Sequence, residues 1–162
     1  MARSGLVILE EDHARFLSVL EILKRESNAK FVFLLDKNGQ QIARSGEIAS
    51  DPTSLASLAA GNVAATEGLA QLIGENEFST LFHEGERDSL HISLISDRII
   101  LLVVFDEHSS LGLVRLRVKQ RSHDLAGIIQ ALMRRDDSGA AAALAGPTLS
   151  EITDEDIDAL FG

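Results

Sequence analysis

The residues best suited to chemistry in this 162-residue chain are its five histidines and one Ser-His-Asp run. His83 and His91 lie on neighbouring predicted strands, where they could face each other across a hairpin, but no third metal ligand is clearly placed beside them. Ser122, His123 and Asp124 are contiguous in a predicted helix, where successive side chains diverge by about 100° and do not converge as a catalytic triad must. We therefore expect no catalytic residue, no metal and no cofactor.

A different pattern runs along a helix predicted from Thr53 to about Glu75, which carries a stripe without large side chains. The stripe occupies positions i, i+3, i+4 and i+7, which share one helix face: Gly61, Ala64, Ala65 and Gly68. A glycine in a helix interior costs about 1 kcal/mol relative to alanine, so two of them need a reason. Either a partner surface approaches this backbone closely, or the helix packs closely on the chain's own sheet. Helix pairing across a homodimer is compatible with the first alternative.

The chain ends in an acidic segment with one apolar face. Residues 136–162 hold seven acidic residues and no basic one, whereas residues 1–135 hold 18 acidic and 15 basic residues. The run EITDEDIDALFG predicts a short helix, and its apolar face consists of Ile157, Leu160 and Phe161. Such a short helix is marginal in water unless it docks. It could dock on the basic 115–121 surface of this chain or in a partner's groove, or form a disordered, solubilising tail.

The helices and strands that position these features can be predicted from the spacing of the apolar residues and from the turn residues between them. Helical spacing predicts helices over residues 10–27, 53–75 and 111–135. In the second helix the expected core stripe is Leu55, Leu58, Leu69, Leu72 and Ile73. Short apolar runs predict strands over 29–36, 40–46, 79–85, 89–96 and 98–106. Their short connections require antiparallel neighbours, so we expect an α+β fold with a five-stranded antiparallel sheet and helices packed on it.

Composition narrows the range of functions. A hydrophobic fraction of 45% supports one buried core, and the absence of cysteine excludes disulfides and a thiol nucleophile. A net charge of -10 argues against nonspecific binding to nucleic acid or to an anionic membrane. The longest apolar run, Ile99 to Phe105, is far below the ~20 residues of a membrane-spanning helix. We expect a cytoplasmic protein with a domain over 1–135, a flexible Ala/Gly linker over 136–149 and the acidic helix over 150–162.

The order of these elements resembles the Roadblock/dynein light chain family. The runs that carry the resemblance are FVFLLDKNGQQIARSG, LASLAAGNVAATEGLAQLIGENEF, LFHEGERDSLHISLI and IILLVVFDEHSSLGLVRLRV. They are most similar to members that act in bacterial gliding motility and cell polarity. The resemblance implies a homodimer in which two sheets join into one continuous sheet and the middle helices pair.

The resemblance also implies a partner, a Ras-like small GTPase of the MglA type, bound by two protomers. It implies stimulation of GTP hydrolysis by repositioning of the GTPase's own residues, without a donated arginine finger, so this chain is not itself an enzyme. The stripe around Ala64 and Gly68 is then expected to face the GTPase, and the C-terminal helix to modulate nucleotide exchange or affinity. A cell pole is a location that the resemblance allows.

Two other functions remain open from the sequence. One is a scaffold of the same fold that tethers a GTPase or motor component without affecting hydrolysis. The other is a small-molecule sensor domain, which the absence of Trp, Tyr and clustered His disfavours.

Overall fold

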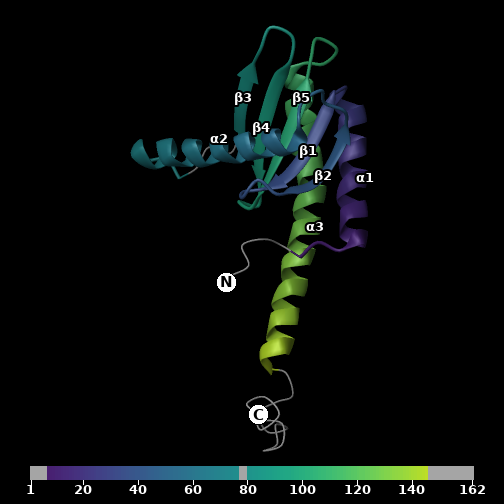
Figure 1. Ribbon diagram of the computed structural model, residues 1–162, viewed down its shortest axis with the longest axis vertical. Coiled ribbons are helices and arrows are strands. Elements are labelled where there is room, and N and C mark those ends of the chain that lie inside the picture. Colours follow the sequence, from purple (N-terminus) through teal and green to yellow (C-terminus); the bar gives the residue numbers. More distant parts are fainter. Residues whose placement is uncertain (1–6, 77–79, 146–162) are drawn as a thin grey trace, which may run out of the picture.

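The computed structural model describes residues 7–76 and 80–145 as three helices and five strands (Figure 1). In chain order the elements are α1 (Glu10–Ser27), β1 (Phe31–Asp36), β2 (Gln41–Gly46), α2 (Pro52–Leu72), β3 (Thr80–Glu84), β4 (Ser89–Ile95), β5 (Ile99–Phe105) and α3 (Leu111–Ala145). This order confirms the predicted fold class. Within the described residues, no helix combines the length and apolar character needed to cross a bilayer.

The five strands form one antiparallel sheet in the order β2-β1-β5-β4-β3. Strand β5 lies at its centre, and all seven of its residues are buried. A strand without a polar face requires cover on both sides of the sheet. Because residues of β5 pack in the buried cores on both sides of the sheet, this strand is covered on both faces.

Helices supply that cover unequally on the two faces. Figure 1 shows α2 crossing one face of the sheet, while α1 and α3 lie side by side on the other. Alternate residues of β5 divide between two cores, so that Leu101 and Val103 pack with α1 and α3, whereas Ile100 and Leu102 pack with α2. The two buried layers share only the sheet between them.

Short polar motifs fix the connections around α2. In the β1–β2 turn, the Asp36 carboxylate accepts hydrogen bonds from the backbone N–H groups of Asn38 and Gln40, each at 2.9 Å. Gly39 closes this turn with φ at +86°, a conformation that suits glycine. Asp51 caps α2 by accepting a 3.1 Å hydrogen bond from the Thr53 N–H. Both boundaries agree with the turn and cap signals in the sequence.

Ion pairs join α1 and α3 at two levels. The Asp12 carboxylate is buried and accepts hydrogen bonds from Arg135 Nη2 at 2.8 Å and from the Leu9 N–H at 2.9 Å. The hydrogen bond from Arg135 is the main reason that the pKa of Asp12 lies below its usual value. At the other end of α1, Glu26 pairs with both Arg117 and Arg121.

Helix α3 is longer than the sequence pattern predicts. It ends at Ala145 instead of Arg135, so residues 136–145 of the expected linker are helical. The high helix propensity of the alanine run outweighs the Ser138-Gly139 pair that reads as a break. The division into domain, linker and acidic helix stays a prediction, and its last part lies outside the described residues.

Candidate functional site

The small-residue stripe lies on the outer face of α2, away from the sheet. All four of its members are exposed: Gly61, Ala64, Ala65 and Gly68. A Cβ atom added at Gly61 or Gly68 would meet no atom within 4 Å apart from its chain neighbours and the adjacent backbone of its own helix. Close packing on the chain's own sheet therefore does not explain these glycines, and that alternative is wrong for the protomer.

The face of α2 that meets the sheet is itself built from small side chains. Its buried residues are Ala56, Ala59, Ala60, Val63 and Ala70. The bulk on this side comes from the sheet, where Phe31, Phe33 and Leu102 are buried beneath the helix. Alanines let the helix approach these large side chains without a void. This packing decides which face of α2 is turned toward the sheet.

The expected core stripe of α2 is therefore wrong for four of its five leucine and isoleucine residues. Leu58 and Leu72 are 74% and 85% exposed, and Leu69 and Ile73 are also exposed. Only Leu55 packs against the core, where it is partly buried. The alanines of α2 have the same helical spacing as its leucines. Periodicity alone therefore left two faces that could pack on the sheet, and the face with the larger side chains is not the one that does.

The outer face of α2 thus consists of a small-residue centre bordered by large apolar side chains. We call it the α2 face and define it by Leu58, Gly61, Ala64, Ala65, Gly68, Leu69 and Leu72. An exposed apolar surface of this kind is typical of a protein interaction site. Sequence reasoning found its centre and missed its leucine border.

The α2 face carries no charge. Glu67 is the one charged residue among the 21 residues of α2, and its carboxylate pairs with Lys37 Nζ at 2.6 Å beside the face. The Asn62 side chain lies 3.4 Å from the His83 ring nitrogen, which ties the helix to β3. Depletion of charge at the centre of a contact region is a feature of protein interfaces.

An open sheet edge lies next to this face. Strand β3 is the last strand of the sheet and, in the described part of the chain, pairs only with β4. The C-terminal part of α2 projects beyond β3 in Figure 1, so the helix and the strand edge are available on the same side of the molecule. Unpaired strand edges are templates for pairing with another chain.

The other residues considered in the sequence do not form a site. Phe82 is opposite His91 and Leu90 is opposite His83 in the β3–β4 ladder, so the two histidines lie on opposite faces of the sheet. The approach across the hairpin that the sequence left open therefore does not occur, and the two residues are ordinary strand residues. Over residues 7–76 and 80–145, no group of three His, Cys, Asp or Glu side chains is placed to hold a metal ion. Ile157, Leu160 and Phe161 lie outside the described residues.

Comparisons with known proteins agree on one family. The Roadblock/LC7 domain model matches residues 16–105. The solved structure of Myxococcus xanthus MglB is 52% identical over 78% of this chain and 96% of its own, with a TM-score of 0.74. The gliding protein MglB from Thermus thermophilus is 35% identical over 80% and 99% of the two chains, with a TM-score of 0.73.

A third solved structure, described as MglB with a tetrameric arrangement, is 33% identical over 81% of this chain and 99% of its own, with a TM-score of 0.74. Comparison with curated proteins finds no significant match.

If the α2 face is free of contacts within the protomer, alanine should be tolerated at its glycines. Gly61→Ala and Gly68→Ala should each raise the free energy of unfolding by roughly 0.5–1 kcal/mol, because alanine restricts the unfolded chain and favours the helix. Urea denaturation at several protein concentrations, which separates protomer stability from self-association, would measure this.

Gly46→Ala is the matched control. Its Cβ would lie 2.3 Å from the Lys30 carbonyl oxygen at a φ of +94°, so this variant should be strongly destabilised. Equal destabilisation of all three variants would mean that the outer glycines have intramolecular roles.

Proposed function

Because this chain belongs to the Roadblock/LC7 family, we propose that it is a homodimeric regulator of a Ras-like small GTPase, and not an enzyme in itself. The observation that carries the proposal is the α2 face, which is exposed, uncharged and bordered by leucines. Burial of large apolar side chains is the main source of favourable free energy in protein association. A protomer that leaves Leu58, Leu69 and Leu72 in water gains from any partner that covers them.

Self-association is the first part of the proposal. Two protomers pair through their α2 helices and join their sheets at the β3 edges. The position of the open β3 edge beside the projecting end of α2 supports this arrangement, since one approach engages both. The tetrameric arrangement described for a 33% identical MglB supports self-association in general terms.

The second part concerns the GTPase. An MglA-like GTPase binds the dimer with two protomers to one GTPase, and the small residues around Ala64 and Gly68 let it approach the helix backbone closely. Helix α2 contains no arginine, so this face has no side chain to donate as a finger. We infer that the dimer stimulates GTP hydrolysis by repositioning residues of the GTPase.

The cellular role follows from the relatives. The Thermus thermophilus relative is named as a gliding protein. The Myxococcus xanthus relative, MglB, is 52% identical to this chain over the matched region. We propose a role in bacterial gliding motility and cell polarity, with the protein acting in the cytoplasm and at a cell pole.

The decisive measurement is GTP hydrolysis by the cognate MglA-like GTPase, with and without a two-fold excess of this protein. We expect at least a tenfold rise in rate, which corresponds to about 1.4 kcal/mol of activation free energy. Binding without acceleration would replace the activator with a scaffold that tethers the GTPase. If the protein neither bound the GTPase nor accelerated hydrolysis, the proposed function would be refuted.

The α2 face can be tested by placing charge on it. Ala64→Arg combined with Gly68→Arg should weaken GTPase binding by at least about tenfold, because two bulky cations would have to be desolvated in the contact. Ala14→Arg with Ser18→Arg is the matched control, since it adds the same charges four residues apart on exposed positions of α1. Sedimentation of each variant would show whether the dimer survives. Wild-type binding by the α2 variant would contradict the assignment.

The acidic segment is proposed as a second contact on the GTPase, through Ile157, Leu160 and Phe161. Removal of residues 148–162 should weaken complex formation or change the rate of nucleotide exchange, because an apolar face of about three side chains would be lost from the contact. Substitution of Asp154, Glu155 and Asp156 by Asn or Gln, with the apolar face retained, separates charge from burial. Unchanged affinity and exchange in the truncated protein would leave the segment without this role.

A further inference from the structure

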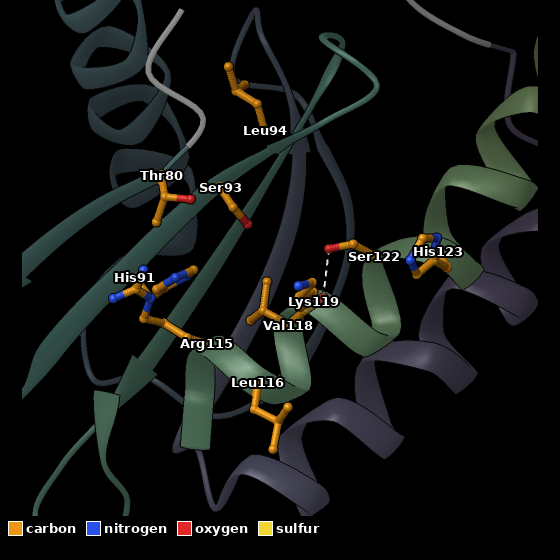
Figure 2. Close-up of a pocket in the computed structure, with 10 residues that line it drawn as sticks. All are labelled: Thr80, His91, Ser93, Leu94, Arg115, Leu116, Val118, Lys119, Ser122 and His123. Carbon is orange, nitrogen blue, oxygen red and sulfur yellow. Dashed lines mark hydrogen bonds between the residues drawn. The ribbon is translucent and has the colours of Figure 1, made fainter. Parts of the chain in front are cut away.

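A cavity on the face of the sheet opposite α2 is not used by the proposed function. It has a volume of about 470 Å³ and lies between the first turns of α3 and strands β3 and β4. Figure 2 shows the residues that line it, which include Thr80, His91, Ser93, Arg115, Lys119 and Ser122. Its volume falls within the ~300–1,000 Å³ that small-molecule sites occupy.

The charge of this cavity is positive and uncompensated. Arg115 and Lys119 lie one helical turn apart on α3, and neither forms an ion pair with any residue in the described ranges. Arg117 and Arg121 of the same helix differ from Arg115 and Lys119 in this respect, because both pair with Glu26 of α1. None of the described residues that line the cavity is acidic. Both residues are exposed, so an anion in the cavity could reach their charges without first breaking an ion pair.

The opposite wall offers two buried polar atoms without partners. Over the described residues, neither His91 Nδ1 nor Ser93 Oγ has a hydrogen-bond partner, although the two residues are only 2% and 7% exposed. Both line the cavity from β4, and Figure 2 shows Arg115 alongside His91 and Ser93 directed toward α3. Buried polar atoms in native proteins are nearly always hydrogen-bonded, so an unpartnered pair beside a cavity indicates that water or a ligand binds there.

The protonation state of His91 suits such a group. Burial, assisted by the charge of Arg115, lowers the pKa of His91 to about 4. The ring is therefore neutral at pH 7, where it carries one N–H donor and does not repel Arg115. The positive charge of the cavity then comes from α3. Ser93 offers a hydroxyl donor from β4, and His91 offers a second donor in the tautomer that carries its proton on Nδ1.

We propose that this cavity binds a phosphate-type oxyanion, either free phosphate or a small phosphomonoester. Arg115 and Lys119 neutralise its charge from the α3 side, and His91 and Ser93 donate hydrogen bonds from the β4 side. Donors on two facing walls match the tetrahedral oxygens of phosphate, and hydrogen bonds to an ionised acceptor are stronger than those between neutral groups. The cavity exceeds the size of phosphate itself, which leaves room for a small organic group. This inference does not rest on the proposed GTPase partner.

The test is calorimetric titration of the full chain alone with inorganic phosphate and with methyl phosphate, against sodium chloride of matched ionic strength. Saturable binding of one anion per protomer is expected. Arg115→Gln combined with Lys119→Gln should weaken it at least tenfold. Arg117→Gln is the matched control, because it removes a cation that faces Glu26, and it should bind within about twofold of wild type. Stronger binding of methyl phosphate than of phosphate would favour a phosphomonoester over free phosphate as the class of ligand.

Ser93→Ala separates a binding role from a structural one. Without phosphate this variant should unfold at the same temperature as wild type or a higher one, since an unpartnered buried hydroxyl is lost. Its phosphate-dependent rise in Tm should be smaller than that of wild type. In wild type, bound phosphate should also raise the pKa of His91, as followed by the NMR signals of its ring.

Three outcomes would overturn the proposal. One is the absence of saturable binding, which would leave water as the partner of these atoms. Another is equal binding by the Arg115 and Arg117 variants, which would indicate nonspecific attraction. The last is phosphate binding only after residues 148–162 are removed, which would assign the cavity to carboxylates of the chain's own acidic end.

Discussion

The absence of a polar face on β5 is the constraint on which the rest of the structure depends. All seven residues of this central strand are buried, so the sheet is stable only when both of its faces are covered. Helices α1 and α3 cover one face as a pair joined by the Asp12–Arg135 and Glu26 ion pairs. A single helix, α2, has to cover the other. This asymmetry leaves one helix with a packed side and an unpacked side.

The packed side of α2 determines what its other side presents. Phenylalanines and leucines of the sheet already fill the space beneath the helix, so alanines face inward. Leu58, Leu69 and Leu72 then have no place in the protomer's core and remain in water, around the stripe that begins at Gly61. The same packing choice therefore completes the fold and creates the candidate interaction surface. The core beneath α2 therefore fixes which face of the helix is exposed, whereas the exposed side chains themselves can be replaced without altering that core.

Much of the fold was predictable because strands and helices differ in period and because turn residues mark their ends. Asp36 to Gly39 and Asp51-Pro52 are such marks, and the structure places boundaries there. The orientation of α2 was not predictable, since its leucines and alanines share one period and only the bulk of the facing strands decides between them. The cavity beside His91 was equally hidden, because it depends on the register of β3 with β4 and on which arginines of α3 meet Glu26.

The length of α3 has a consequence for whatever follows it. Arg135 is held to the start of α1, and the ten helical residues beyond it extend the chain by about 15 Å away from that contact. Figure 1 shows this helix running well past the sheet. A helical spacer fixes the point from which the chain continues, so the length of α3 sets how far that point lies from the Asp12–Arg135 contact.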